Sequence, residues 1–394
     1  MQLEIIIPTV SGRERYLEWC IRSCLEQGAH TQVLVSNNGG ADTVRELVSS
    51  FCDPRIRLIE PPAFLPMPLH WEFAVEQAQG DILTIIGDDD ALVPEAAGRV
   101  IGQFQMHPEI ECVTHKPAQY YWPDYPVKEM RNRLSCPVTD GTATVLPTKP
   151  ALKRVLEYKA WYGTLPYIYH GFVRRSALDR IRKLHGSLFK RIAPDVYADL
   201  LLATFLESFL VLNECLSVGG QGARSFGATF QLNHGEAVRT VNELPECLKP
   251  IFSPKSMTLQ LYEYGSMLRK FWPLDFVVEP SWWRFTAQTL IEAIRSSHYR
   301  NSREEIMRDF GTVTREIFPA FTGFAARATI SFARLQPVPF IVMYFLEKRH
   351  QRQIANWEVV AGQRGVENVY AAARYVLETT QNSVAQEPSC ISSQ

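Results

Sequence analysis

Residues 78–94 contain an apolar run that leads directly into three consecutive aspartates: Ala78-Gln79-Gly80-Asp81-Ile82-Leu83-Thr84-Ile85-Ile86-Gly87-Asp88-Asp89-Asp90-Ala91-Leu92-Val93-Pro94. The run from Ile82 to Ile86 is apolar except for Thr84, which predicts a buried strand in the centre of a sheet. Pro94 is expected to start the helix that follows. Because ligands bind beyond the carboxyl ends of strands in open parallel sheets, the three carboxylates lie where a ligand is expected.

The sequence before this segment alternates strand and helix patterns with short turns. We expect strands over residues 3–7, 32–36 and 55–59, and helices over residues 15–27, from Asp42 onward and over residues 69–79. The second strand ends in the turn Asn37-Asn38-Gly39-Gly40, whose residues tolerate positive φ. This alternation predicts an α/β fold with a mostly parallel sheet flanked by helices.

Three adjacent carboxylates on a tight turn repel one another strongly in a poorly solvated site unless a cation neutralises them. Oxygen ligands suit Mg²⁺ or Mn²⁺, which complete their coordination with water and phosphate oxygens. The run from Asp88 to Asp90 therefore predicts a divalent-metal site. The alternative is a solvated acidic turn that caps the next helix, although an exposed cap rarely needs three acids directly after a buried strand.

The composition limits the class of protein. With 394 residues, of which 46% are hydrophobic, the chain is long enough for one large domain and an additional unit. Its 41 Lys and Arg residues balance 42 Asp and Glu residues, so no global field favours nucleic acid or an anionic membrane. The eight cysteines show no CxxC pair, and we expect reduced, mostly buried thiols, with Cys20 and Cys24 packed on one helix face.

The N-terminal residues and the hydropathy bear on location. Met1 leads straight into an apolar strand pattern without the basic region and cleavage site of a secretory signal, which predicts a cytoplasmic protein. No apolar run reaches the roughly 18 residues that a membrane-spanning helix needs.

Beyond residue 110 the pattern changes several times. Residues 114–161 are irregular and rich in Pro, Tyr and Trp, which predicts loops built over a site. A helix is expected to open at Pro194, an apolar strand near residues 209–212, and helices beyond residue 240. The expected organisation is a catalytic domain at 1–240 with halves at 1–115 and 116–240, a helical C-terminal region at 241–380, and a disordered tail at 381–394.

Two further segments share their order and spacing with a known family. Ile5-Ile6-Ile7-Pro8-Thr9 and Val33-Leu34-Val35-Ser36-Asn37-Asn38-Gly39-Gly40-Ala41-Asp42 precede the acidic segment. Together the three segments resemble family 2 glycosyltransferases of the GT-A fold, closely over residues 3–110 and loosely over residues 165–235. The resemblance implies transfer of a sugar from a nucleotide-diphosphate sugar, with a UDP-sugar as the expected donor, to an acceptor hydroxyl, with Mn²⁺ or Mg²⁺ as cofactor.

Carried over position by position, the resemblance assigns roles to individual residues. The residues expected to bind the nucleotide sugar are Pro8, Thr9, Asn37, Asn38, Asp88, Asp89, Asp90 and His170. The expected metal ligands are Asp89, Asp90 and His234. The family often has Asp where this chain has the two asparagines, which leaves the nucleotide base open. A structural role for His170 and a surface position for His234 are the alternatives.

The resemblance also implies a general base that deprotonates the acceptor hydroxyl. Asp195 fits, because it lies in the first turn of the helix expected at Pro194, where the positive end of the helix dipole favours an ionised carboxylate. Asp199 lies one turn later on the same face and is the second choice. The alternative is that Asp195 only stabilises its helix. Attack from the face opposite the departing nucleotide implies inversion at the anomeric carbon.

Two other classes of function stay open. One is a catalytically silent GT-A-like binding or assembly module, for which the two asparagines leave room. The other is a nucleotidyltransferase, but that class normally has a Gly-rich, basic loop after its first strand, whereas residues 8–13 hold one glycine. Arg13, Arg15 and Arg224 are expected to be surface residues rather than phosphate ligands.

The expected acceptor is a saccharide or a lipid-linked molecule in bacterial polysaccharide or glycolipid synthesis. The apolar run Pro337–Leu346 precedes a basic stretch and is expected to be a buried core helix. The alternative is a peripheral contact of the C-terminal region with the inner face of the membrane.

Overall fold

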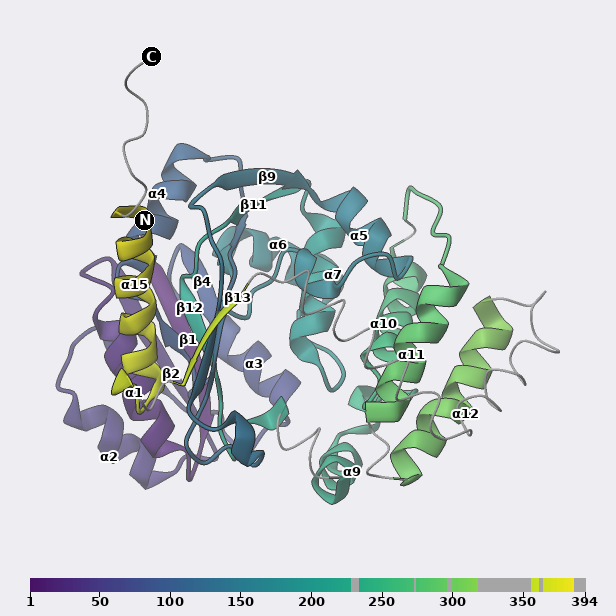
Figure 1. Ribbon diagram of the computed structural model, residues 1–394, viewed down its shortest axis with the longest axis horizontal. Coiled ribbons are helices and arrows are strands. Elements are labelled where there is room, and N and C mark those ends of the chain that lie inside the picture. Colours follow the sequence, from purple (N-terminus) through teal and green to yellow (C-terminus); the bar gives the residue numbers. More distant parts are fainter. Residues whose placement is uncertain (228–233, 273, 296–299, 318–355, 361–363, 386–394) are drawn as a thin grey trace, which may run out of the picture.

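The computed structural model describes residues 1–394 except 228–233, 273, 296–299, 318–355, 361–363 and 386–394. Within the described residues, the strands form an eight-stranded sheet and a five-stranded sheet. Helices flank the sheets, and a further group of helices stands at one side of the molecule (Figure 1).

The large sheet begins with four parallel strands in the order β3-β2-β1-β4: β1 (Leu3–Val10), β2 (Thr31–Asn38), β3 (Ile56–Ile59) and β4 (Ile82–Ile85). It continues from β4 with β10 (Phe172–Arg174), β6 (Cys112–Thr114), β11 (Ser208–Leu212) and β9 (Ala143–Pro147). Strand β10 is antiparallel to both of its neighbours, so this half of the sheet is mixed. The predicted α/β fold is confirmed, with every strand expected before residue 90 in place.

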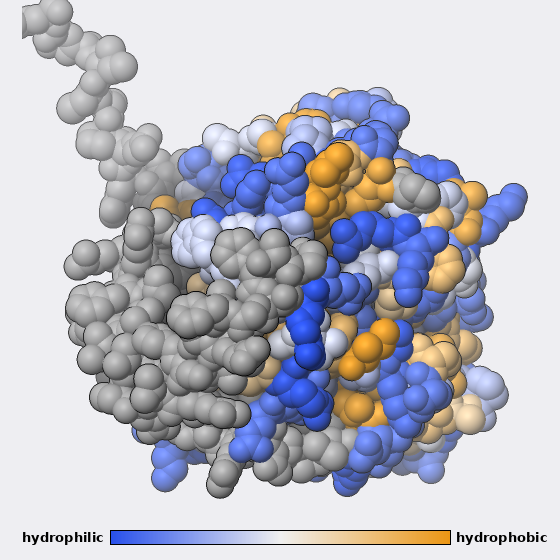
Figure 2. Space-filling view, turned by 90° about the vertical axis from the view of Figure 1, so that its right-hand side faces the viewer, coloured by the Kyte–Doolittle hydropathy of each residue, from blue (hydrophilic) through white to orange (hydrophobic). Residues whose placement is uncertain are grey.

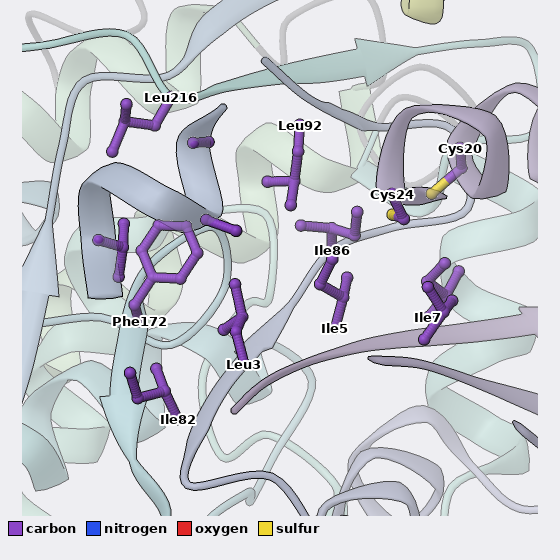
Figure 3. Close-up of a cluster of buried hydrophobic side chains, with 14 of the residues drawn as sticks. Leu3, Ile5, Ile7, Cys20, Cys24, Ile82, Ile86, Leu92, Phe172 and Leu216 are labelled. Atoms are coloured by element: carbon purple, nitrogen blue, oxygen red, sulfur yellow. The ribbon is translucent and has the colours of Figure 1, made fainter. Parts of the chain in front are cut away.

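Strand β1 is buried on both faces of the sheet. Ile5 and Ile7 belong to one apolar cluster, whereas Ile6 belongs to another on the opposite face. Figure 3 shows Cys20 and Cys24 on one side of helix α1 (Glu14–Leu25), facing the first cluster, as predicted from their spacing. Since burial of an aliphatic side chain stabilises the fold by about 1.5–3 kcal/mol, burial of β1 on both faces contributes strongly to the core.

Helices of the described part of the chain cover both faces of the large sheet. Helices α1, α2 (Asp42–Ser50) and α4 (Ala96–Met106) contribute to the cluster of Ile5 and Ile7. Helices α3 (Met67–Glu76), α6 (Arg175–His185) and α7 (Pro194–Phe205) contribute to the cluster of Ile6. Helix α7 opens at Pro194 as predicted, whereas α4 begins at Ala96, two residues after Pro94.

The prediction of loops over residues 114–161 was wrong. This region contains β7 (Ala118–Tyr121), β8 (Arg133–Pro137), β9 and α5 (Thr148–Leu156). The small sheet, in the order β13-β8-β7-β12-β5, joins β7 and β8 to β5 (Ala91–Leu92), β12 (Ser217–Gln221) and β13 (Asn356–Val360). These strands are short, and apart from the pairing of β7 with β8 their partners lie far away in the sequence, so a local pattern predicts them poorly.

Helices follow residue 234, as predicted for the C-terminal region: α9 (His234–Glu243), α10 (Met257–Phe271), α11 (Trp282–Arg295) and α12 (Arg300–Ile317). Helices α10, α11 and α12 stand together on the right in Figure 1. From that side the surface is a mosaic of hydrophilic residues and separate hydrophobic patches (Figure 2). None of the described helices is long and apolar enough to cross a membrane. The segment Pro337–Leu346 lies outside the described residues.

The end of the chain returns to the N-terminal domain. Helix α15 (Val369–Ala385) lies beside α1 in Figure 1, and its Val369 and Val376 are buried in one cluster with Tyr16. Tyr370 stacks on Trp19 of α1, with the ring centroids 6.0 Å apart. The first residues of the predicted tail are thus helical, and the predicted domain boundaries stay a prediction.

Candidate active site

Asp88 is held by the end of β1 and the loop that follows it. The Thr9 hydroxyl donates a hydrogen bond to Asp88 Oδ2 (2.5 Å), and Arg13 Nε lies 2.7 Å from Oδ1 and 2.8 Å from Oδ2. Both Thr9 and Asp88 are buried, while Pro8 is half-buried. Thr9, expected to contact the nucleotide, therefore positions Asp88 in this structure.

Asp89 shares the Arg13 cation with Asp88. Arg13 Nη2 lies 2.5 Å from Asp88 Oδ1 and 3.1 Å from Asp89 Oδ1. Burial raises the pKa of Asp89 to about 7; the Arg13 charge opposes this rise, and the neighbouring Asp90 and Asp88 charges add to it. Asp88 and Asp89 therefore share the single positive charge of Arg13.

The loop directly after β12 closes over Asp89. The Ser225 hydroxyl donates a hydrogen bond to Asp89 Oδ2. Arg13 donates to the main-chain oxygen of Arg224, and Arg224 donates to that of Gly12 (2.8 Å). The loops after β1 and β12 are thus tied to each other across the acidic run.

Asp90 connects the acidic turn to the surrounding fold. Its Oδ2 accepts a hydrogen bond from the Tyr169 hydroxyl (2.7 Å) and lies 3.2 Å from His170 Nε2, and its Oδ1 accepts from the Gly220 N–H (2.7 Å). Position 220 requires glycine, because a Cβ there would lie 1.7 Å from the main-chain oxygen of Asp89. Although burial raises it, the His170 charge and these hydrogen bonds hold the pKa of Asp90 below its ordinary value. A metal role for Asp90 stays a prediction.

His170 lies beneath the acidic turn and is only 6% exposed. Its Nδ1 lies 2.8 Å from Ser217 Oγ, while its Nε2 faces Asp90. The main-chain oxygen of His170 lies 2.9 Å from His115 Nε2. Burial, followed by the His170 charge, lowers the pKa of His115 to about 3, so His115 is neutral near pH 7. In this structure His170 supports Asp90, and its predicted contact with the nucleotide sugar stays a prediction.

The two asparagines predicted to contact the base make hydrogen bonds within the protein. Asn37 Nδ2 donates to Glu60 Oε1 (2.6 Å) and to the main-chain oxygen of Ala41 (3.1 Å). The Asn38 amide exchanges two hydrogen bonds with the main chain of Leu65, at 2.7 Å and 2.9 Å. Both side chains thus shape the edge of the sheet at the carboxyl ends of its strands.

Asp195 lies in the first turn of α7, as predicted, and is half-buried. Burial raises its pKa above the ordinary value, although backbone N–H groups lower it. Helix α10 fixes the approach to α7: the Tyr264 hydroxyl accepts a hydrogen bond from the Ala193 N–H (3.2 Å), and Arg191 Nε lies 2.9 Å from Glu263 Oε1. The C-terminal helices thereby position the predicted base.

Asp199 lies one turn further along α7 and is 5% exposed. Its Oδ1 is buried without a hydrogen-bond partner among the described residues. Burial and then the Asp195 charge raise its pKa well above the ordinary value, which favours the protonated form. A neutral acid makes Asp199 the weaker of the two candidate bases.

Tyr169 joins the acidic turn to the base helix. Its ring stacks on Trp71 with the centroids 5.4 Å apart, while its hydroxyl donates to Asp90. Burial raises its pKa most, and the charges of Asp90, Asp89 and Asp195 add to that rise. Tyr169 also packs against the apolar cluster that includes Ala198 of α7, so this residue connects the acidic turn to the helix that carries Asp195.

Sequence reasoning missed Arg13, Ser225 and Tyr169. The Arg13 side chain is 12% exposed, so its expected surface position was wrong, whereas the Arg15 side chain is 60% exposed. A signal for Arg13 existed, because β1 and β4 pair in parallel and their following loops meet at one edge. Ser225 and Tyr169 carry no comparable local signal. The side chain of His234 lies outside the described residues.

Asp88 and Asp89 fit a divalent cation. One oxygen of each carboxylate already converges on a single guanidinium nitrogen, and both are the hard oxygen ligands that Mg²⁺ and Mn²⁺ prefer. Among the described residues, no three or more His, Cys, Asp or Glu side chains are grouped to hold a metal. Water and substrate oxygens are therefore needed to complete the coordination, as is usual for Mg²⁺.

Comparison with known proteins identifies a family for the N-terminal part of the chain and similar solved structures. Residues 4–182 match the family described as Glycosyl transferase family 2. The structure of S. aureus TarS 1–349 in complex with UDP-GlcNAc is similar with a TM-score of 0.50 and 12% identity, over 90% of this chain and 92% of that chain. The mannosyltransferase PcManGT from Pyrobaculum calidifontis in complex with GDP-Man and Mn²⁺ has a TM-score of 0.42 and 14% identity, over 84% of this chain and 86% of that chain. No curated protein matches the sequence. Residues 4–182 therefore form a family 2 glycosyltransferase domain of the GT-A fold, and the chain is a glycosyltransferase.

Proposed function

We propose that the chain is a metal-dependent, inverting transferase that moves a sugar from a UDP-sugar to the hydroxyl of a saccharide or lipid-linked acceptor. The observation that carries the proposal is the pair of buried carboxylates Asp88 and Asp89 on one guanidinium, together with the half-buried Asp195 in the first turn of α7. UDP-sugars are the first donors to test, because the TarS structure of the same fold holds UDP-GlcNAc. A cytoplasmic role in bacterial polysaccharide or glycolipid synthesis completes the proposal.

In this mechanism Asp88 and Asp89 would hold Mn²⁺ or Mg²⁺, which would supply Lewis-acid stabilisation of the departing diphosphate when bound. Asp90 positions the turn through its hydrogen bonds with the Tyr169 hydroxyl and the Gly220 N–H. Asp195 takes the proton from the acceptor hydroxyl while that oxygen bonds to the anomeric carbon. The bond from this carbon to the diphosphate oxygen breaks on the opposite face, which inverts the configuration and releases the nucleoside diphosphate.

A panel of UDP-, GDP- and TDP-sugars tests the donor site by calorimetry with and without Mn²⁺. We expect one nucleotide class to bind, and to bind at least about tenfold more tightly with the metal, because a divalent cation offsets the repulsion between diphosphate and carboxylates. Metal-dependent hydrolysis of the bound sugar nucleotide without acceptor would further support an active enzyme. Binding without any hydrolysis or transfer would favour the silent module instead.

The Asp199→Asn variant is expected to be more stable than the wild type at pH 7, by about 0.5–2 kcal/mol in the free energy of unfolding. Because the pKa of Asp199 is raised in the fold, the folded protein retains a proton that the unfolded chain releases at neutral pH. This residue therefore lowers stability as pH rises above 3.8, its ordinary pKa. Thermal unfolding at several pH values measures the effect. A fall in transfer of about 100-fold or more in this variant would make Asp199 the base.

A further inference from the structure

Trp161 is an exposed tryptophan beside the helix that carries the predicted base. It is 58% exposed, and its ring centroid lies 4.2 Å from that of Tyr162 at an interplanar angle of 44°. A single exposed aromatic side chain is common on protein surfaces and needs no explanation by itself. Trp161 differs from other exposed aromatic residues in the turn that contains it and in the groups that surround it.

The main chain holds the indole in position. The Trp161 carbonyl accepts hydrogen bonds from the Thr164 N–H (3.1 Å) and the Thr164 hydroxyl (2.8 Å), which close the turn η2 (Tyr162–Thr164). A Cβ at Gly163 would lie only 3.1 Å and 3.2 Å from two indole atoms, so glycine lets the ring lie over the turn. Among the described residues, the indole N–H has no hydrogen-bond acceptor. The turn therefore exposes the aromatic face of Trp161 together with an indole N–H that has no acceptor among the described residues.

The inner side of this turn packs against the base helix. Tyr162 lies against an apolar cluster that includes Val196 and Leu200 of α7. Burial and then the negative charges of Asp195 and Asp199 raise the pKa of Tyr162 above its ordinary value. Tyr162 thus lies between the exposed Trp161 and the helix that carries the predicted base Asp195.

We propose that Trp161 and Tyr162 form the platform on which the acceptor sugar lies, with a pyranose ring packed on the indole and one of its hydroxyls directed to Asp195. A pyranose has an apolar C–H face and a polar hydroxyl edge, and an aromatic ring with a polar tip matches both. This inference rests on the proposed transfer to a saccharide acceptor. It assigns acceptor binding to a surface apart from the donor site at Asp88 and Asp89.

Saturation-transfer NMR with the methyl glycopyranosides of glucose, galactose, mannose and N-acetylglucosamine tests the platform in the presence of UDP and Mn²⁺. We expect at least one glycoside to bind the wild type, and its affinity to fall roughly tenfold in Trp161→Ala, the size of a lost aromatic contact. Trp161→Tyr keeps an aromatic face and should retain most of the binding. Phe271→Ala is the matched control, because Phe271 is 59% exposed and lies at the end of α10.

The outcomes separate the platform from the donor site. UDP affinity should be unchanged in all three variants, and with a bound glycoside as acceptor, Trp161→Ala should raise the acceptor KM far more than it lowers kcat. Equal glycoside binding by Trp161→Ala and the wild type would overturn the inference, as would a wild type that binds UDP but no glycoside. A wild type that binds no nucleotide would contradict the proposed function itself.

Discussion

The Asp195→Asn variant is expected to transfer sugar about 10³-fold more slowly than the wild type, since general-base catalysis contributes on the order of 10²–10⁴-fold. Asparagine has the same shape and suits the start of α7, but it cannot take a proton from the acceptor hydroxyl. Donor affinity should stay unchanged, because Asp195 acts on the acceptor hydroxyl and not on the nucleotide in the proposed mechanism. Acceptor-dependent release of the nucleoside diphosphate measures the rate, and calorimetry measures the donor affinity.

The pH dependence of this reaction tests whether Asp195 is the base. Burial raises the pKa of Asp195, so the carboxylate ionises only at a pH above the ordinary value of 3.8. The value of kcat/KM should therefore fall as pH drops through this raised pKa, and Asp195→Glu should retain part of the rate with a shifted acid limb. Asp89, with its pKa near 7, titrates in the donor-free protein as well, and donor binding measured across the same pH range separates its contribution. An Asp195→Asn enzyme with more than a tenth of wild-type activity would exclude Asp195 as the base.

The fold of the first hundred residues was predictable because its signals are local. The apolar run from Ile82 to Ile86 can be buried only in the interior of a sheet, and the turn after Asn38 ends its strand at the same edge. The small sheet was not predictable in this way. Its strand β7 pairs Ala118 with Val218, a hundred residues later, and neither segment has the length or alternation that identifies a strand alone.

The candidate site was likewise predictable only where its signals are local in the sequence. Three consecutive aspartates and an aspartate after a helix-opening proline are visible as patterns, and the structure brings both into reach of Tyr169. The roles within the acidic run were not visible, because they depend on partners from elsewhere in the chain. Arg13 reaches Asp88 and Asp89, and the loop of Ser225 closes over them from 136 residues beyond Asp89. Tertiary contacts, not residue type, decide which carboxylate faces a cation and which one anchors the turn.

The Asp89→Ala variant is expected to lose metal-dependent donor binding by more than about 100-fold, since removing a group that only hydrogen-bonds to a metal ligand already costs about 10–100-fold. Asp88 remains in this variant as a pair with Arg13, so the site loses one carboxylate ligand and one negative charge. Calorimetry with and without Mn²⁺, using the donor that binds the wild type, measures the loss. Asp275→Ala is the matched control, because Asp275 and its partner Lys149 are an exposed pair with side-chain exposures of 63% and 61%.

The unfolding temperature distinguishes the loss of a metal ligand from a loss of folding in the Asp89→Ala variant. The pKa of Asp89 is about 7 in the folded protein against an ordinary 3.8, so the wild type loses stability as pH rises from the lower value to the higher one. The alanine variant lacks this loss and should unfold at pH 7 at a temperature no lower than the wild type does. A well-folded Asp89→Ala protein that still binds the donor more tightly with Mn²⁺ would show that the cation lies elsewhere. In that case the Arg13 bridge would hold the acidic run together without any metal, and Asp89 would serve the turn as Asp90 does.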